Sequence, residues 1–189
     1  LIEQLEAQLP ADFDNWKNVT YIEPFVGGGA MLFYMLQRYP HIRRAIINDI
    51  NPDLCTCYRT VRDMPEQLIK ALYEVERTYL SLKTEEDRKS YFMSVREHYN
   101  EKKLNAIENT TLFFFLNRTC FNGLYRVNKK GLFNVPFGKY ANPTICDPGT
   151  IRKDSELLQQ VEILNEDFEV TFDYAHGNTL FWLLSLLGA

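Results

Sequence analysis

The sequence is poor in the residue types that bind metals or form disulfides, with four cysteines and three histidines among 189 residues. The cysteines form no Cys-x-x-Cys pair and the histidines lie far apart, so no metal site is expected. Reduced thiols, as in a cytoplasmic protein, are the expected state of the four cysteines. These are Cys55, Cys57, Cys120 and Cys146.

The sequence also lacks a signal peptide and a hydrophobic run of the roughly 20 residues that span a bilayer. A soluble, cytoplasmic protein without a membrane partner is therefore expected, and we expect a monomer. Hydrophobic residues make up 46% of the chain, which is ample for a folded core.

A glycine triplet, Gly27-Gly28-Gly29, joins the apolar segment 21–26 to the apolar run 31–36. This pattern predicts a buried strand, a tight turn and a helix. Such a turn lets the backbone approach a ligand closely, and the helix that follows directs unpaired N–H groups at it. No Gly-x-Gly-x-x-Gly is present and no Lys-Ser/Thr follows the glycines, which favours a small adenosine ligand over a dinucleotide or a triphosphate. An ordinary strand-to-helix turn would have the same pattern.

A carboxylate follows at the distance that a nucleoside ligand requires. Asp49 lies 20 residues after Gly29, at the carboxyl end of a second apolar strand in 45–51. In sheets with a glycine-rich first turn, an acidic residue in this place commonly accepts the ribose hydroxyls.

The net charge of −4 hides a basic segment, because no acidic residue occurs between Glu108 and Asp147. This stretch carries five cations, so the rest of the chain is about −9. The asymmetry is typical of an acidic enzyme with a segment that faces phosphates, although a solvated basic hairpin without function would look the same. The cations are Arg118, Arg126, Lys129, Lys130 and Lys139.

The centre of the chain interrupts the alternation of strands and helices. Amphipathic patterns predict helices, the first capped by Asn51 with Pro52 at its first position. The apolar segment 111–116 is either a strand or a helix. Gly131 supplies the positive φ that a hairpin turn with a bulge needs, so 124–135 is predicted to be a β-hairpin with a basic tip. The predicted helices span about 52–61, 65–82 and 85–104.

This hairpin has the parts needed to bind duplex DNA. Lysines can contact phosphates, and the guanidinium of Arg126 can form a bidentate pair with guanine. Asn122 can pair with adenine, and Phe121 can insert where a base leaves the stack, unless it packs in the core.

Three motifs together resemble the Dam-type adenine-specific DNA methyltransferases in order and spacing: 23–30 (Glu-Pro-Phe-Val-Gly-Gly-Gly-Ala), 48–51 (Asn-Asp-Ile-Asn) and 117–126 (Asn-Arg-Thr-Cys-Phe-Asn-Gly-Leu-Tyr-Arg). The resemblance implies an α/β fold: a Rossmann-like S-adenosylmethionine-dependent methyltransferase sheet with an inserted helical and β-hairpin DNA-recognition subdomain. Residues 1–61 and 149–189 would form the cofactor-binding core, and 62–148 the target-recognition subdomain. The implied cofactor is S-adenosylmethionine, and the implied partner is double-stranded DNA with a flipped adenine.

The resemblance also implies site residues. Asp167 would accept from the cofactor's exocyclic amine and Phe168 would stack on its adenine, although an acidic loop residue before a core phenylalanine would also fit. The implied cofactor-binding residues are Glu23, Pro24, Phe25, Gly27, Gly28, Gly29, Asp49, Asp167 and Phe168. The implied DNA-binding residues are Arg118, Phe121, Asn122, Leu124, Arg126, Lys129, Lys130, Pro136 and Lys139.

The sequence departs from the family where catalysis is expected. After 177–181, where the family carries Asp-Pro-Pro-Tyr, the chain reads Trp-Leu-Leu-Ser-Leu-Leu-Gly-Ala and ends. No catalytic residue is therefore assigned, and the chain is expected to be truncated and inactive, as a lost reading frame would make it. A DNA adenine methyltransferase and a non-catalytic DNA-binding remnant both stay open. A small-molecule enzyme with the same turn is disfavoured by the basic hairpin.

Overall fold

The computed structural model describes residues 5–183, which divide into two compact units. The described part of the first unit is 5–55 with 156–183, and the second unit is Thr56–Ser155. The chain passes from one unit to the other within α3 (Pro52–Asp63) and returns within α7 (Pro148–Leu158). Each unit is described by itself below.

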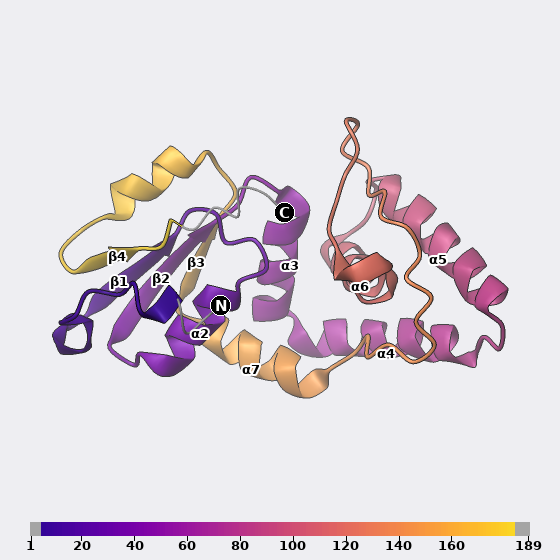
Figure 1. Ribbon diagram of the computed structural model, residues 1–189, viewed down its shortest axis with the longest axis horizontal. Helices are drawn as coiled ribbons and strands as arrows, with labels where there is room; N and C mark the ends of the chain where they lie inside the picture. Colours follow the sequence, from indigo (N-terminus) through magenta and orange to yellow (C-terminus); the bar gives the residue numbers. More distant parts are fainter. Residues whose placement is uncertain (1–4, 184–189) are drawn as a thin grey trace. The chain divides into compact units, whose positions relative to one another are not determined.

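The first unit is built on a parallel four-stranded sheet with the order β3-β2-β1-β4 (Figure 1). All three strand pairs are parallel, and Ile22 lies opposite Ile46 at the centre. Both isoleucines are fully buried, because a parallel sheet is covered on both faces. The strands are β1 (Val19–Glu23), β2 (Ile42–Asn48), β3 (Val161–Leu164) and β4 (Thr179–Phe181).

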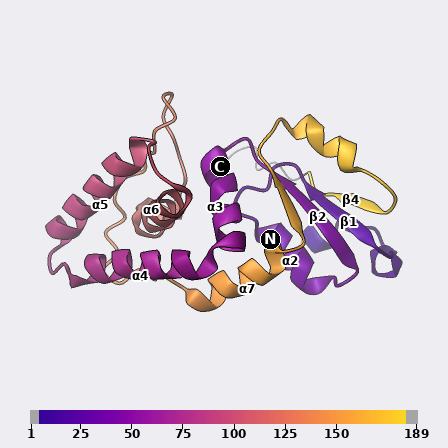
Figure 2. The same cartoon turned by 180° about the vertical axis from the view of Figure 1, so that it is seen from behind.

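Helical segments lie on both sides of this sheet, as Figures 1 and 2 show. The helix α2 (Ala30–Arg38) follows the glycine triplet, and the 3₁₀ segment η3 (Phe168–Tyr174) follows β3. A short 3₁₀ turn, η1 (Phe13–Asn15), precedes β1. The predicted strand, turn and helix at the glycine triplet are therefore confirmed.

The second unit is helical. Its helices are α4 (Pro65–Ser81), α5 (Glu85–Asn100) and α6 (Ala106–Thr119), together with most of α3 and α7. The central helix α6 packs on α4 and α5 through Phe115, whose ring centre lies 5.6 Å from that of Tyr79. The helices predicted over 65–82 and 85–104 are confirmed, although α5 ends at Asn100, close to Lys102 with its positive φ of 56°.

The segment 111–116, which periodicity left open, is helical. It lies inside α6, whose start is fixed by a reciprocal capping box between Asn105 and Glu108. The Asn105 side chain accepts from the Glu108 N–H at 3.0 Å, and the Glu108 side chain accepts from the Asn105 N–H at 3.1 Å. The capping box thus begins the helix before the apolar run.

The predicted β-hairpin at 124–135 forms its turn but not two regular strands. Gly131 has the expected positive φ of 74°, and the cross-strand pairing is limited to one bridge between Val127 and Phe133. The Asn128 side chain accepts from the N–H groups of Lys130 and Leu132. These local hydrogen bonds favour a turn over an extended ladder.

No helix among residues 5–183 is long and apolar enough to cross a membrane. The chain is also expected to be truncated where the family carries Asp-Pro-Pro-Tyr. That expectation concerns mostly residues 184–189, which lie outside the described residues.

Candidate functional site

The glycine turn borders open space at the carboxyl edge of the sheet. Gly27 and Gly29 have positive φ values of 51° and 71°, and Gly29 caps α2. The Val26 N–H donates to the Asn48 carbonyl at 3.0 Å, which fixes the turn to the end of β2. A Cβ at Gly27 or Gly28 would meet no other heavy atom of the described chain within 4 Å. A ligand could therefore lie close to the backbone at these glycines.

Asp49 lies beside this turn, directly after β2. Its Oδ2 accepts from the Gly27 N–H at 3.1 Å, and its Oδ1 accepts from the Asn51 N–H at 2.9 Å. The Asn51 side chain in turn accepts from the Asp53 N–H at 3.1 Å, as expected of the residue that caps α3. Asp49 therefore braces the turn, and each carboxylate oxygen keeps a second lone pair for a ligand.

Asn48 joins the glycine turn to the loop after β3, a role that the sequence did not reveal. The residue is 2% exposed, and its Nδ2 donates to the carbonyls of Pro24 and Glu166, both at 3.1 Å. Its Oδ1 accepts from the Glu166 N–H at 3.0 Å. Pro24 itself is buried and takes part through its backbone. In the sequence, Asn48 stood out only as a polar residue at the end of an apolar strand and as the first residue of the motif 48–51.

Three exposed phenylalanines and the half-buried Phe181 form a row on the same edge. The ring centres of Phe25 and Phe168 are 5.3 Å apart, and Phe172 follows 6.2 Å from Phe168 and 5.3 Å from Phe181. Phe168 is 38% exposed, so the alternative that it is a core residue is wrong. The sequence reasoning missed Phe172 and the 76% exposed Ile50, because only exposure distinguishes them from core residues.

The acidic residues of this edge have different environments. The Asp167 side chain caps η3 by accepting from the Glu169 N–H at 3.0 Å. Glu23, at the end of β1, is 5% exposed and accepts from the Tyr21 hydroxyl at 2.9 Å. Burial raises the pKa of Glu23 to about 7, against the lowering effect of this hydrogen bond. Glu23 can therefore hold a proton near neutral pH.

In the second unit, the predicted DNA-binding residues lie on one segment, 117–139, which is exposed throughout 121–131. Phe121 is 52% exposed and Leu124 is 50% exposed, so the alternative of core packing for Phe121 is wrong. Asn122 has a positive φ of 53°. The Phe121 N–H donates to the carbonyl of the exposed Pro136 at 2.8 Å, and the Asn117 amide donates to the Gly123 carbonyl at 2.6 Å.

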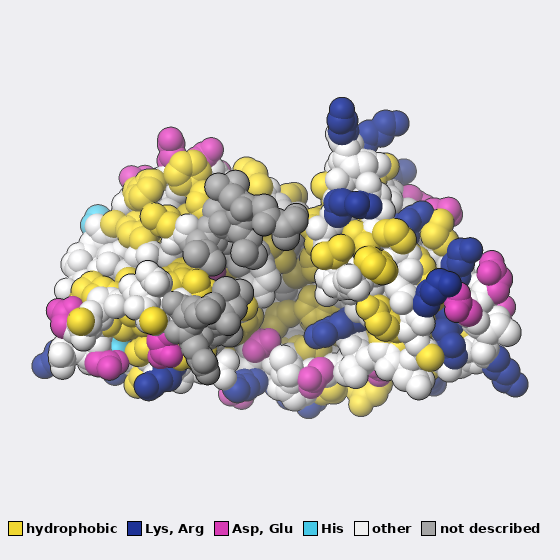
Figure 3. Space-filling view, in the orientation of Figure 1, with side chains coloured by type: hydrophobic (Ala, Val, Ile, Leu, Met, Phe, Trp, Pro, Cys, Tyr) yellow, Lys and Arg dark blue, Asp and Glu magenta, His cyan; other side chains and the backbone are white. Residues whose placement is uncertain are grey.

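The cations of this segment differ in their partners. Arg126 donates from Nε to the Asn134 Oδ1 at 2.9 Å and from Nη2 to the Asn134 carbonyl at 3.3 Å. Lys139 forms an ion pair with Glu85 at 3.0 Å. Arg118, Lys129 and Lys130 are exposed, and cationic side chains gather at the tip of this segment in Figure 3.

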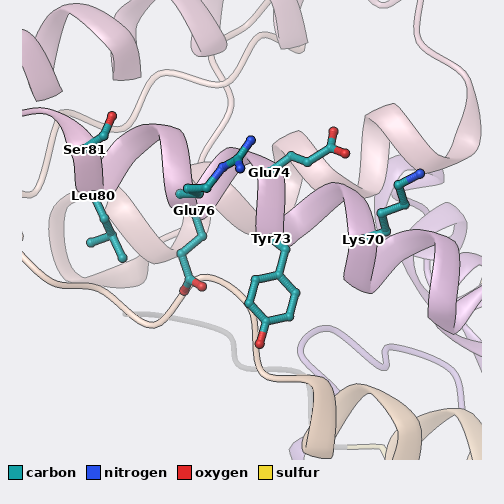
Figure 4. Close-up of a pocket in the computed structure, with 7 residues that line it drawn as sticks. Lys70, Tyr73, Glu74, Glu76, Leu80 and Ser81 are labelled. Carbon is teal, nitrogen blue, oxygen red and sulfur yellow. The ribbon is translucent and has the colours of Figure 1, made fainter.

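Two groups of predicted residues thus form, one in each unit. The cofactor residues meet at the carboxyl edge of the sheet, and the DNA-binding residues lie in 118–139. An open groove along α4, lined by Lys70, Tyr73 and Leu80 among others, contains none of them (Figure 4). Within the described part of the chain, no three acidic, histidine or cysteine side chains are grouped so as to hold a metal ion.

A parallel sheet of order β3-β2-β1-β4, with a glycine turn after its first strand and a carboxylate after its second, is typical of the class of Rossmann-like α/β proteins. Residues 1–183 match the D12 class of N6 adenine-specific DNA methyltransferases, and the chain belongs to this family.

Named relatives agree with this assignment. The chain is 44% identical over 181 residues to the type II methyltransferase M.MjaIII of Methanocaldococcus jannaschii. The aligned region covers 95% of this chain and 62% of the relative. It is 35% identical to the type II methyltransferase M1.LlaDCHI of Lactococcus lactis, over 89% of this chain and 55% of the relative. It is 34% identical to a DNA adenine methylase of Vibrio cholerae, over 96% of this chain and 59% of the relative. The chain thus spans little more than half the length of these proteins.

Proposed function

We propose that this chain is the cofactor- and DNA-binding part of a site-specific DNA adenine methyltransferase that transfers a methyl group from S-adenosylmethionine to the exocyclic amine of a flipped adenine. The observation that carries the proposal is the open space beside Gly27 and Gly28, next to the carboxylate of Asp49 and the ring of Phe25. Family membership supports the reaction class.

The residues at the carboxyl edge fit S-adenosylmethionine in chemical type. Asp49 offers lone pairs to ribose hydroxyls, and the exposed faces of Phe25 and Phe168 offer a surface on which a purine can stack. Asp167 offers an acceptor to the adenine amine. The buried carboxyl of Glu23 suits a cationic group, because a nearby positive charge would favour its ionised form. When bound, the donor supplies a methyl group on a sulfonium, which is electrophilic.

The segment 117–139 fits duplex DNA. Its exposed lysines can neutralise phosphates, and its exposed apolar side chains, including Phe121, can enter between bases. Asn134 occupies Nε and one N–H of Nη2 on Arg126, so the Nη1 end stays available for a guanine edge. Arg126 is therefore oriented before DNA arrives.

We assign no catalytic residue within 5–183. Methyl transfer to an adenine amine requires a carboxylate and a carbonyl that accept its hydrogens, and the 189-residue sequence contains no Asp-Pro-Pro-Tyr segment to provide them. The second candidate function is that of a DNA-binding protein that retains cofactor affinity without turnover.

Calorimetry with S-adenosylmethionine and a methyl-transfer assay on duplex DNA separate the two candidates. If the first candidate is correct, the whole protein that contains this chain should bind S-adenosylmethionine and transfer tritiated methyl to adenine, and Asp49→Ala should weaken both activities. Binding of cofactor and duplex without transfer supports the second candidate. A folded chain that binds neither would refute both.

Arg126→Ala tests the DNA-binding half of the proposal, with Lys129→Ala as the matched control. Loss of Arg126 should abolish the preference for one duplex sequence over random duplex, whereas loss of Lys129 should weaken binding to all sequences equally. Cofactor affinity should not change in either variant. If Arg126→Ala keeps the wild-type preference in moderate salt, Arg126 does not read sequence.

A further inference from the structure

The Asn48 side chain makes three hydrogen bonds, all to backbone groups outside its own strand. Asn48 lies in β2, and its side chain contacts residues that are far away in the sequence, Pro24 on one side and Glu166 on the other. Both N–H groups of its Nδ2 are used, and its Oδ1 accepts a third hydrogen bond. The side chain is buried, so water does not replace these partners easily.

The two segments that Asn48 joins carry different parts of the proposed donor site. The segment after Pro24 contains Phe25 and the glycine turn, and the segment after Glu166 contains Asp167 and Phe168. The rings of Phe25 and Phe168 lie 5.3 Å apart, centre to centre. Phe25 lies one residue after Pro24, and Phe168 lies two residues after Glu166. The hydrogen bonds of Asn48 therefore fix how far apart the two backbone segments that carry these rings lie.

Only an amide fits this position. Pro24 and Glu166 present carbonyl oxygens, which need donors, whereas the Glu166 N–H needs an acceptor. Aspartate has nearly the same shape, but its carboxylate would place oxygen against two carbonyl oxygens and leave both unsatisfied. Serine could satisfy one of the partners and would leave a space.

Other contacts near Asn48 hold strand ends together. The Asn165 amide donates to the Asp49 carbonyl at 2.8 Å, and the Cys55 thiol donates to the Leu164 carbonyl at 3.1 Å. Both contacts join the end of β2, or the start of α3, to the end of β3. The Asn48 side chain differs because it reaches the segment before the glycine turn.

We infer that Asn48 is a positioning residue of the donor site, whose amide holds the Phe25 segment against the Phe168 segment so that both contact one S-adenosylmethionine. The inference rests on the proposed function. Asn48 would contribute to the affinity for S-adenosylmethionine without contacting it. Its loss should weaken donor binding without changing DNA binding, because the proposed DNA contacts lie in the other unit.

The test compares Asn48→Asp and Asn48→Ser with Val19→Ala. Val19 is fully buried at the opposite, amino end of β1, so its truncation destabilises the same sheet without touching either segment. S-adenosylmethionine affinity is measured by calorimetry at a temperature well below each melting point, and duplex affinity by fluorescence anisotropy.

Asn48→Asp should raise the Kd for S-adenosylmethionine about tenfold or more, and Asn48→Ser by a smaller factor, since two lost hydrogen bonds to buried carbonyls correspond to at least this change. Val19→Ala should lower the melting temperature and leave this Kd within about twofold of wild type. The Kd for duplex should be unchanged in all three variants. If Asn48→Asp does not fold, the effect of Asn48→Ser decides.

Two outcomes would overturn the inference, and they differ. If the Asn48 variants bind S-adenosylmethionine as wild type does, or no more weakly than Val19→Ala at equal loss of melting temperature, Asn48 has only a structural role and the proposed function stands. If wild-type protein does not bind S-adenosylmethionine at all, the proposed function fails and the inference fails with it.

Discussion

Replacement of Gly28 by alanine separates folding from ligand binding at the glycine turn. Gly28 lies outside the positive-φ region, and an added Cβ would meet no described heavy atom within 4 Å. Alanine should therefore be accommodated in the folded protein. Because it also restricts the unfolded chain, we expect a gain in stability of about 0.4 to 1 kcal/mol. For a protein of this length this is a rise in melting temperature of about 1 to 4 °C.

The same methyl group should block the ligand. A glycine backbone that a ligand touches leaves no room for a Cβ between them, so the ligand must shift away from the turn. We expect the Kd for S-adenosylmethionine to rise at least about tenfold, which corresponds to about 1.4 kcal/mol. The variant should thus be more stable and bind the cofactor less tightly, a combination that general damage to the fold does not produce.

Gly27→Ala is the matched comparison at the neighbouring position. Its added Cβ also meets open space, but Gly27 has a φ of +51°, where a side chain costs about 1 to 2 kcal/mol. Both variants should lose cofactor affinity, whereas their melting temperatures should move in opposite directions. Thermal melts and calorimetry on the three proteins measure both quantities. Wild-type cofactor affinity in a stabilised Gly28→Ala would show that no ligand lies against the turn.

Three further changes probe the chemistry and stability of the two units. Burial raises the pKa of Glu23 from 4.5 to about 7. The contribution of this group to the free energy of unfolding is therefore full below pH 4.5 and falls by up to about 3 kcal/mol as the pH rises through 7. Glu23→Gln should remove this pH dependence from thermal melts between about pH 5 and 8. Asn105→Ala should destabilise α6 by about 1 kcal/mol in urea unfolding, and an unchanged midpoint would argue against the capping box. Gly138→Ala places a Cβ against the Cys120 carbonyl oxygen, so it should cost about 1 to 3 kcal/mol and weaken duplex binding while cofactor affinity is kept. Equal loss of both affinities would contradict separate sites.

Local patterns in the sequence predicted much of the fold. The glycine triplet and the cap at Asn51 act within a few residues, and each has the predicted structure. The apolar segments at 21–26 and 45–51 each contain the end of a strand, although β1 and β2 begin two to three residues before them. The resemblance to the methyltransferase family rested on the same segments and is confirmed over 1–183. The site residues themselves stay predictions until ligands are bound.

Other features depend on partners far away in the chain and could not be predicted. Periodicity did not decide between strand and helix at 111–116, because burial in a helical unit makes a helix apolar on most sides. The hairpin at 124–135 has a single bridge, and the Asn128 side chain accepts from the Leu132 N–H, a backbone group that a ladder would use.

The sequence by itself determined most of the strands, turns and helices, and which motifs place the chain in its family, because these depend on the order of neighbouring residues. The tertiary structure alone decided that Asn48 bonds Pro24 and Glu166, and that Phe25 meets Phe168 in an exposed row. Such contacts arise when parallel strands bring their carboxyl ends to one edge, and the separation of their residues along the chain gives no local signal of it.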